Sequence, residues 1–205
     1  IENATRDAGH ILVNMPEGVK MRVLEMRAMP LAVLIDLVHR NGGVLGPAHP
    51  CGEKYMSFTN ARKFYQSPEI VKRFDFVEAF NSCESVQSNA GAEKLAKKYG
   101  KVMTGGSDSH KPGCVGRGYT ILPEPVTCET ELISLIHKKT AFKAGGTLYE
   151  KTTKERIGKI NKLLVYSFWV YNKSGELVKR RGRNKKMVEE HPFDPIDPIE
   201  LDYHS

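Results

Sequence analysis

The fold class is indicated most directly by Val102-Met103-Thr104-Gly105-Gly106-Ser107-Asp108-Ser109-His110. The first residues of this stretch are apolar or β-branched, which predicts a short buried strand. Two glycines and a polar run follow, and glycine lets a backbone turn sharply where a side chain would crowd. In parallel α/β folds, functional loops lie at the carboxyl ends of the strands. The stretch therefore predicts a parallel strand that ends in a functional loop.

The same succession of apolar strand, polar loop and amphipathic helix occurs elsewhere along the chain. Further strands are predicted at residues 10–13, 44–48, 75–80 and 118–122. Helices are predicted at residues 21–40, with a fresh start at Pro30, and at residues 59–65, 89–99 and 129–139. Helices that alternate with short apolar strands are typical of parallel β/α units. The expected fold class is therefore α/β.

Beyond Gly146 the sequence changes character. Residues 157–171 are apolar with helical spacing, and this helix would either pack on the core or mediate self-association. The basic run at residues 179–186 is either a solvated tail or a patch for nucleic acid or another polyanion. Residues 191–199 contain three prolines, which indicates an extended tail. We expect two parts, an α/β domain at residues 1–146 and a C-terminal extension at residues 147–205.

The overall composition is that of an ordinary soluble chain. Hydrophobic residues make up 40% and charged residues 27% of the 205 residues, enough to build a core. The sequence has no apolar run of about 18 residues that would predict a membrane helix. The first residues are too polar for a signal peptide, and the four cysteines form no Cys-x-x-Cys pair. We expect a cytoplasmic protein with reduced thiols that serve as packing residues.

Three of the seven histidines, His10, His49 and His110, lie beside predicted strand ends. Asp108 precedes His110 by two residues, so a carboxylate and an imidazole can face one cavity from a tight loop. These groups are good ligands for zinc, manganese or iron. The alternative is a Ser- and Asp-rich turn that caps a helix. The other four histidines are assigned to helix surfaces or to the tail: His39, His137, His191 and His204.

These residues belong to a series of short motifs with a recognisable order. The series comprises Ile1-Glu2, Gly9-His10-Ile11-Leu12, Gly46-Pro47-Ala48-His49-Pro50, Phe76-Val77-Glu78-Ala79-Phe80-Asn81, and Thr104 to His110 followed by Val115-Gly116. In order and approximate spacing it resembles the polymerase-and-histidinol-phosphatase (PHP) superfamily of metal-dependent phosphoesterases. The resemblance covers about residues 1–146.

The resemblance implies a distorted seven-stranded (β/α)7 barrel, of which residues 1–146 would form the C-terminal two-thirds. It also implies up to three divalent ions, zinc, manganese or iron, at the strand ends. By position the metal ligands would be Glu2, as a bridging carboxylate, and His10, His49, Asp108 and His110. Asn81 and Arg117 would lie near the substrate, although Arg117 is equally well explained as a surface arginine. Glu78 is expected to be a neighbour of the site rather than a ligand.

The chain departs from the family pattern at its beginning. The pattern opens with a His-x-His strand and an Asp-His pair, and neither occurs in this sequence. We therefore expect the N-terminal third of the barrel to be absent, disordered or supplied as a separate chain. The function implied is hydrolysis of a phosphomonoester or a short oligonucleotide by a metal-activated hydroxide, without a serine or cysteine nucleophile. The alternative is a non-catalytic fragment or partner-binding module with an incomplete metal site.

Overall fold

The computed structural model describes residues 1–53, 56–110 and 112–150. Its strands are β1 (Glu2–Ala4), β2 (His10–Asn14), β3 (Val44–Pro47), β4 (Phe76–Asn81), β5 (Val102–Gly106), β6 (Gly118–Ile121) and β7 (Lys143–Gly146). Its α-helices are α1 (Leu31–Arg40), α2 (Arg62–Gln66), α3 (Val86–Lys98) and α4 (Glu129–His137). Its 3₁₀ helices are η1 (Arg22–Glu25), η2 (Phe58–Asn60), η3 (Pro68–Arg73) and η4 (Pro112–Cys114).

These ranges include only residues 147–150 of the expected C-terminal extension. The predicted helix at residues 157–171, the basic run and the proline-rich tail all lie outside the described residues. Among the residues that are described, no helix has the length and apolarity needed to cross a bilayer.

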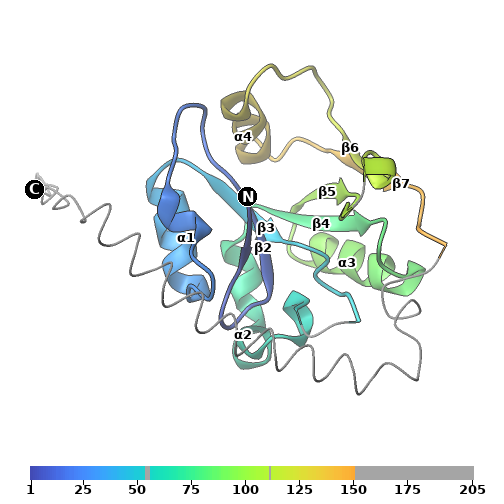
Figure 1. Ribbon diagram of the computed structural model, residues 1–205, viewed down its shortest axis with the longest axis horizontal. Coiled ribbons are helices and arrows are strands. Elements are labelled where there is room, and N and C mark those ends of the chain that lie inside the picture. Colours follow the sequence, from blue (N-terminus) through green and yellow to red (C-terminus); the bar gives the residue numbers. More distant parts are fainter. Residues whose placement is uncertain (54–55, 111, 151–205) are drawn as a thin grey trace, which may run out of the picture. The chain divides into compact units, whose positions relative to one another are not determined.

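The strands form three short sheets (Figure 1). β1, β2 and β3 pair antiparallel in that order, β4 and β5 pair parallel, and β6 and β7 pair antiparallel. β1 and β2 are joined by a tight reversal in which the Thr5 hydroxyl donates to the Gly9 carbonyl and accepts from the Ala8 amide. Gly9 has a φ of 74°, which suits a residue without a side chain. The first two strands are therefore a hairpin rather than a β/α unit.

The predicted (β/α)7 barrel is wrong, because none of the three sheets in the described residues closes. The structure is instead a small α/β fold, and within the described ranges the expected parallel unit is formed by β4, α3 and β5 only. The sheets adjoin one another at glycines. A Cβ on Gly46 would overlap the Phe76 carbonyl of β4, and a Cβ on Gly105 would overlap the Tyr119 carbonyl of β6. At both glycines the neighbouring strand lies where a side chain would be. In a hydrogen-bonded sheet, by contrast, neighbouring strands meet through their N–H and C=O groups.

The core explains how β3 is held in place. The buried face of α1, formed by Leu31, Leu34, Ile35 and Val38, has helical spacing and packs in one cluster with Leu45 of β3. The preceding residue, Val44, belongs to a second cluster that includes Ile133 and Ile136 of α4. Because successive strand residues point to opposite faces, β3 is covered by apolar side chains on both sides. The residues that follow β3 therefore start from a rigid strand.

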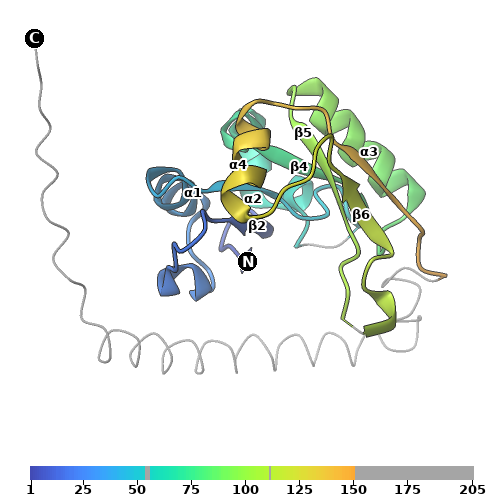
Figure 2. The ribbon, with the colours of Figure 1, turned by 90° about the horizontal axis from the view of Figure 1, so that it is seen from above.

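The helix positions agree with the sequence more closely than the sheet topology does. α1 begins directly after Pro30 and ends at Arg40, as predicted, whereas the predicted helix before Pro30 is replaced by the 3₁₀ helix η1. The helix expected at residues 59–65 is divided at Ala61 into η2 and α2. α3 begins before residue 89, because the Ser85 hydroxyl accepts a hydrogen bond from the Ser88 amide and caps the helix there. Both ribbon views show α3 running alongside β4 and β5 (Figure 2).

Gly46→Ala is expected to destabilise the fold by about 1–3 kcal/mol, because overpacking at a rigid contact costs that much. The added methyl would overlap the Phe76 carbonyl and lie 2.6 Å from a carbon of the Phe76 ring, and both groups are fixed in β4. Gly113→Ala is the control, since a Cβ there meets nothing within 4 Å. Urea unfolding monitored by circular dichroism measures the difference. Equal midpoints for the two variants would contradict the packing described for β3 and β4.

Candidate metal site

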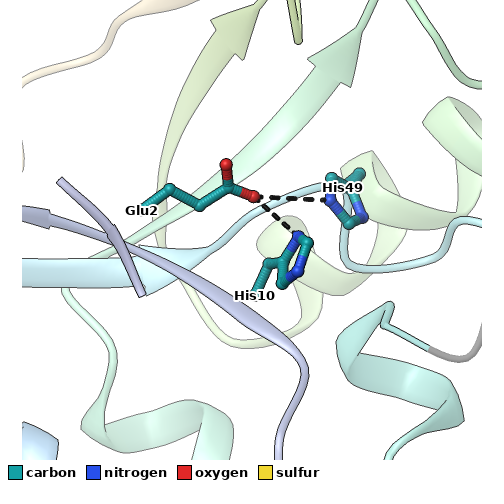
Figure 3. A group of neighbouring side chains, drawn as sticks. All are labelled: Glu2, His10 and His49. Carbon is teal, nitrogen blue, oxygen red and sulfur yellow. Dashed lines mark ion pairs between the residues drawn. The ribbon is translucent and has the colours of Figure 1, made fainter. Parts of the chain in front are cut away.

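Three of the five predicted ligands, Glu2, His10 and His49, come together at one end of the first sheet (Figure 3). Glu2 lies in β1, His10 begins β2, and His49 follows β3. The antiparallel register places Ala4 opposite His10 and Leu12 opposite Glu2. Glu2 and His10 are therefore diagonal neighbours on the same face, within reach of each other's side chains. The Ala48 amide donates to the His10 carbonyl, which brings the neighbouring His49 to the same place.

The donor atoms of the three side chains are close enough to bind one cation. His10 Nδ1 lies 2.7 Å and His49 Nε2 lies 3.9 Å from Glu2 Oε1. One donor atom from each residue lies within 4.8 Å of the other two. His10 Nδ1 is buried, and its contact in the described structure is the ion pair with Glu2. A buried imidazole nitrogen beside a carboxylate and a second imidazole fits a divalent cation.

His49 is held by two polar contacts. Its backbone amide donates to Glu78 Oε2 at 2.6 Å, and its ring Nδ1 lies 3.3 Å from the Ser57 hydroxyl. The tautomer with its proton on Nδ1 donates that proton to Ser57 and leaves the lone pair of Nε2 free on the side of Glu2. The residue has a φ of 32°, a left-handed conformation that is uncommon outside glycine. The surrounding contacts therefore fix both the turn and the ring.

The electrostatics of the three groups favour the protonation states that a metal requires. The close polar contact with His10 holds the pKa of Glu2 below its usual value, so this carboxylate is ionised at neutral pH. Burial lowers the pKa of His49, which keeps its imidazole neutral. Metal ligands must be deprotonated, so neither group has to lose a proton at neutral pH before it binds a cation.

The other two predicted ligands lie apart from this group. Asp108 Oδ1 and His110 Nε2 are 3.3 Å apart, but the His110 side chain is 85% exposed. Among the described residues, neither joins a set of three or more donor atoms with the spacing seen for Glu2, His10 and His49. Asp108 has a φ of 45°, and its negative charge raises the pKa of His49, although the lowering by burial is larger. The charge of Asp108 therefore influences His49, but the side chains of this loop do not add a ligand atom to the group of Glu2, His10 and His49.

The glycines before this loop have a different role from the one expected. β5 continues through Gly105 and Gly106, so neither forms a turn beside an ion. Both are required instead for close approach of neighbouring groups, the Tyr119 carbonyl at Gly105 and the Glu78 carboxylate at Gly106.

The two residues expected near the substrate differ in their surroundings. Asn81 is buried, its Nδ2 donates to Glu78 Oε2 at 3.0 Å, and its Oδ1 accepts from the Cys83 amide at 2.8 Å. Its amide therefore has contacts inside the protein, and its role toward a substrate stays a prediction. Arg117 is exposed, with its guanidinium 5.5 Å from the centre of the Tyr149 ring. This position leaves both interpretations of Arg117 open.

Sequence reasoning gave too little importance to Ser57 and Glu78, and it missed Tyr149. The Ser57 hydroxyl contacts His49 and makes no capping bond to η2. Tyr149 donates its hydroxyl hydrogen to the Ser107 carbonyl at 2.5 Å and so anchors the loop that carries Asp108. No local pattern marks Ser57 or Tyr149, because their contacts depend on how the chain folds. The acidic Glu78 in an otherwise apolar buried strand was the one available signal.

Glu78 is expected to make stability depend on pH. Burial raises the pKa of this carboxyl from an ordinary 4.5 to about 7, so the folded chain holds its proton more tightly than the unfolded chain does. In metal-free protein, the stability of the wild type relative to Glu78→Gln should be highest below pH 4.5. It should fall by about 3 kcal/mol as the pH rises from 4.5 to about 7, because in this range the carboxyl ionises in the unfolded chain and stays protonated in the folded chain.

Urea unfolding of the wild type and of Glu78→Gln across this pH range measures the effect. Glu93→Gln, which changes an exposed carboxylate paired with Lys97 on α3, is the matched control. A stability difference between the wild type and Glu78→Gln that stays constant with pH would contradict the burial of an ionisable carboxyl at this position.

Comparison with known proteins gives one match. A family model described as PHP-associated matches residues 86–141, from the start of α3 to just beyond α4. This match is consistent with a relation to the PHP superfamily, and it includes the loop with Asp108 and His110. It does not extend to Glu2, His10 or His49, so the three-residue group is an independent observation. No curated protein and no solved structure matches the chain.

Proposed function

We propose that the chain is a metal-dependent phosphoesterase whose cation is held by Glu2, His10 and His49. The observation that carries the proposal is the convergence of the donor atoms of these three side chains, with the buried Nδ1 of His10 beside Glu2. Two imidazole nitrogens and one carboxylate oxygen suit zinc, manganese or iron. The PHP-associated match supports the phosphoesterase assignment, because it comes from a different part of the chain.

The residues around the cation would have distinct roles. A bound divalent cation supplies Lewis acidity, which polarises a phosphoryl oxygen and makes water more acidic. The ionised Glu2 would retain the cation, and the rings of His10 and His49 would fix its position. Asp108 and His110 are proposed as further ligands that approach from the neighbouring loop. Arg117 would bind a phosphate through its planar guanidinium, and Asn81 would contact the substrate.

The proposed substrate is a phosphomonoester or a short oligonucleotide. The formal net charge of +7 suits either anion. The two classes differ in their response to salt, because several phosphate contacts make oligonucleotide binding strongly salt-dependent. A small phosphomonoester with one charged group should be nearly indifferent to the same change.

The full chain, stripped with a chelator and reloaded with zinc or manganese, tests this function. We expect the reloaded protein to hydrolyse p-nitrophenyl phosphate or a short oligonucleotide and the stripped protein to be inactive. His10→Ala should remove the activity, whereas His137→Ala should keep it, because His137 is an exposed residue of α4. Absence of hydrolysis by the reloaded chain, with every ester and ion tried, would refute catalysis.

A second candidate is a non-catalytic module in which the cation stabilises the fold. The exposure of His110 outside the three-residue group favours it, since a ligand set restricted to Glu2, His10 and His49 serves structure as well as catalysis. This candidate predicts that zinc raises the unfolding temperature without any ester hydrolysis. Thermal unfolding and activity measured on the same preparation separate the two functions.

A further inference from the structure

Glu78 is an acidic side chain in the interior of the protein, only 6% exposed in the middle of β4. One of its oxygens, Oε2, accepts two hydrogen bonds, from the His49 amide at 2.6 Å and from Asn81 Nδ2 at 3.0 Å. A buried carboxyl without such partners would be strongly unfavourable. The carboxyl therefore ties the turn after β3 to the adjacent strand β4.

The bond to His49 acts on the part of the backbone that sets the direction of the ring. With a φ of 32°, His49 has a conformation that an L-residue adopts only when its surroundings impose it. The residues before it lie in the rigid strand β3, and its amide is fixed by Glu78. Loss of this acceptor would leave a buried amide unpaired and allow the turn to relax. The His49 ring would then move away from Glu2 and His10.

Gly106 of β5 provides the space in which the carboxyl lies. A Cβ at this position would overlap Glu78 Oε1, with the carboxyl carbon 3.3 Å away. The carboxyl is thus confined on one side by its two hydrogen-bond donors and on the other by a backbone that has no side chain. This arrangement leaves it little freedom to move toward a cation or away from His49.

We propose that Glu78 is a positioning residue for the metal site, which it serves by holding the His49 turn. It is not a ligand, since it acts through the backbone of His49. The inference rests on the proposed metal-binding function. In this role Glu78 acts through the two hydrogen bonds that its Oε2 accepts, and not through a negative charge.

Cobalt binding by the full chain tests this role, because the visible spectrum of Co²⁺ reports on the geometry of its ligands. The variants are Glu78→Ala, Glu78→Gln and Gly106→Ala, each titrated with cobalt under conditions where circular dichroism shows it folded. Glu78→Ala and Gly106→Ala should weaken cobalt binding by about 10–100-fold and alter the spectrum, as losses of supporting contacts around metal ligands do. Glu78→Gln should retain both, since its amide oxygen can accept the same two hydrogen bonds.

Leu135→Ala controls for loss of stability alone. Leu135 is buried in α4, so Leu135→Ala should lower the unfolding temperature. It should leave the cobalt affinity and the cobalt spectrum unchanged. If the wild type binds cobalt and Glu78→Ala binds it with the same affinity and spectrum, the positioning role is refuted while the metal site stands. If Glu78→Gln loses affinity as Glu78→Ala does, the role of hydrogen-bond geometry is refuted. If the wild type binds no cobalt, the proposed function itself fails.

Discussion

His49→Ala is expected to weaken zinc binding by more than about 100-fold, because loss of a mere supporting partner of a ligand already costs 10–100-fold. His49, which follows β3, has its Nε2 3.9 Å from Glu2 Oε1. Its neutral ring is ready to bind, since burial lowers the pKa of His49. Isothermal titration calorimetry of the stripped protein with zinc measures the effect.

Two comparisons make this result specific to the site. His137→Ala removes a histidine that is exposed on α4, and it should bind zinc as the wild type does. With a chelator present, the unfolding temperatures of the wild type and His49→Ala should differ little. With zinc present, the difference between the two unfolding temperatures should be larger. Unchanged zinc affinity in His49→Ala would show that zinc binds elsewhere.

Phe58→Ala is expected to destabilise the fold by about 3–5 kcal/mol, the range for removal of a fully buried aromatic ring. Phe58 is completely buried in η2. Its ring makes edge contacts with Phe64 and Phe74, with centroid separations of 5.3 and 5.1 Å. Such aromatic pairs add to the free energy of burial. Urea unfolding of the metal-free variant provides the measurement.

The effect of Phe58 should extend to the metal site. Phe58 directly follows Ser57, whose hydroxyl contacts His49 Nδ1, so loosening η2 also loosens that contact. Phe58→Ala should therefore gain less stability from zinc than the wild type gains. Tyr65→Ala is the control, since this ring is 72% exposed and surface changes usually alter stability by less than about 0.5 kcal/mol. Equal destabilisation by the two variants would contradict the core described here.

The local elements were predictable from the sequence because their causes are local. The apolar spacing of α1, the proline before it and the glycines after it all lie within one short segment. The sheet topology was not predictable in this way. Nothing in the apolar run of β3 shows that β2 pairs with it antiparallel, or that Gly46 meets the Phe76 carbonyl. The alternation of strands and helices indicated parallel units, but β1 pairs with β2, β2 with β3 and β6 with β7 in antiparallel orientation.

The candidate site was predictable to a similar extent. The positions of His10 and His49 beside strand ends were visible in the sequence, and the structure brings both next to Glu2. Glu78 was expected beside the site, but its hydrogen bond to the His49 amide and the contact of Ser57 with the His49 ring arise only through the folding of β4 and η2. Local patterns find groups with distinctive chemistry, whereas hydroxyls and amides that orient them have no distinctive sequence signal.

X-ray absorption at the zinc edge of the zinc-loaded chain tests the central claim most directly. Its fine structure distinguishes imidazole ligands from carboxylate and water by the scattering of the ring atoms. The claim predicts imidazole scattering that includes His10 and His49 and that falls by one imidazole in His49→Ala. A zinc spectrum without imidazole scattering, or one that His49→Ala leaves unchanged, would contradict it.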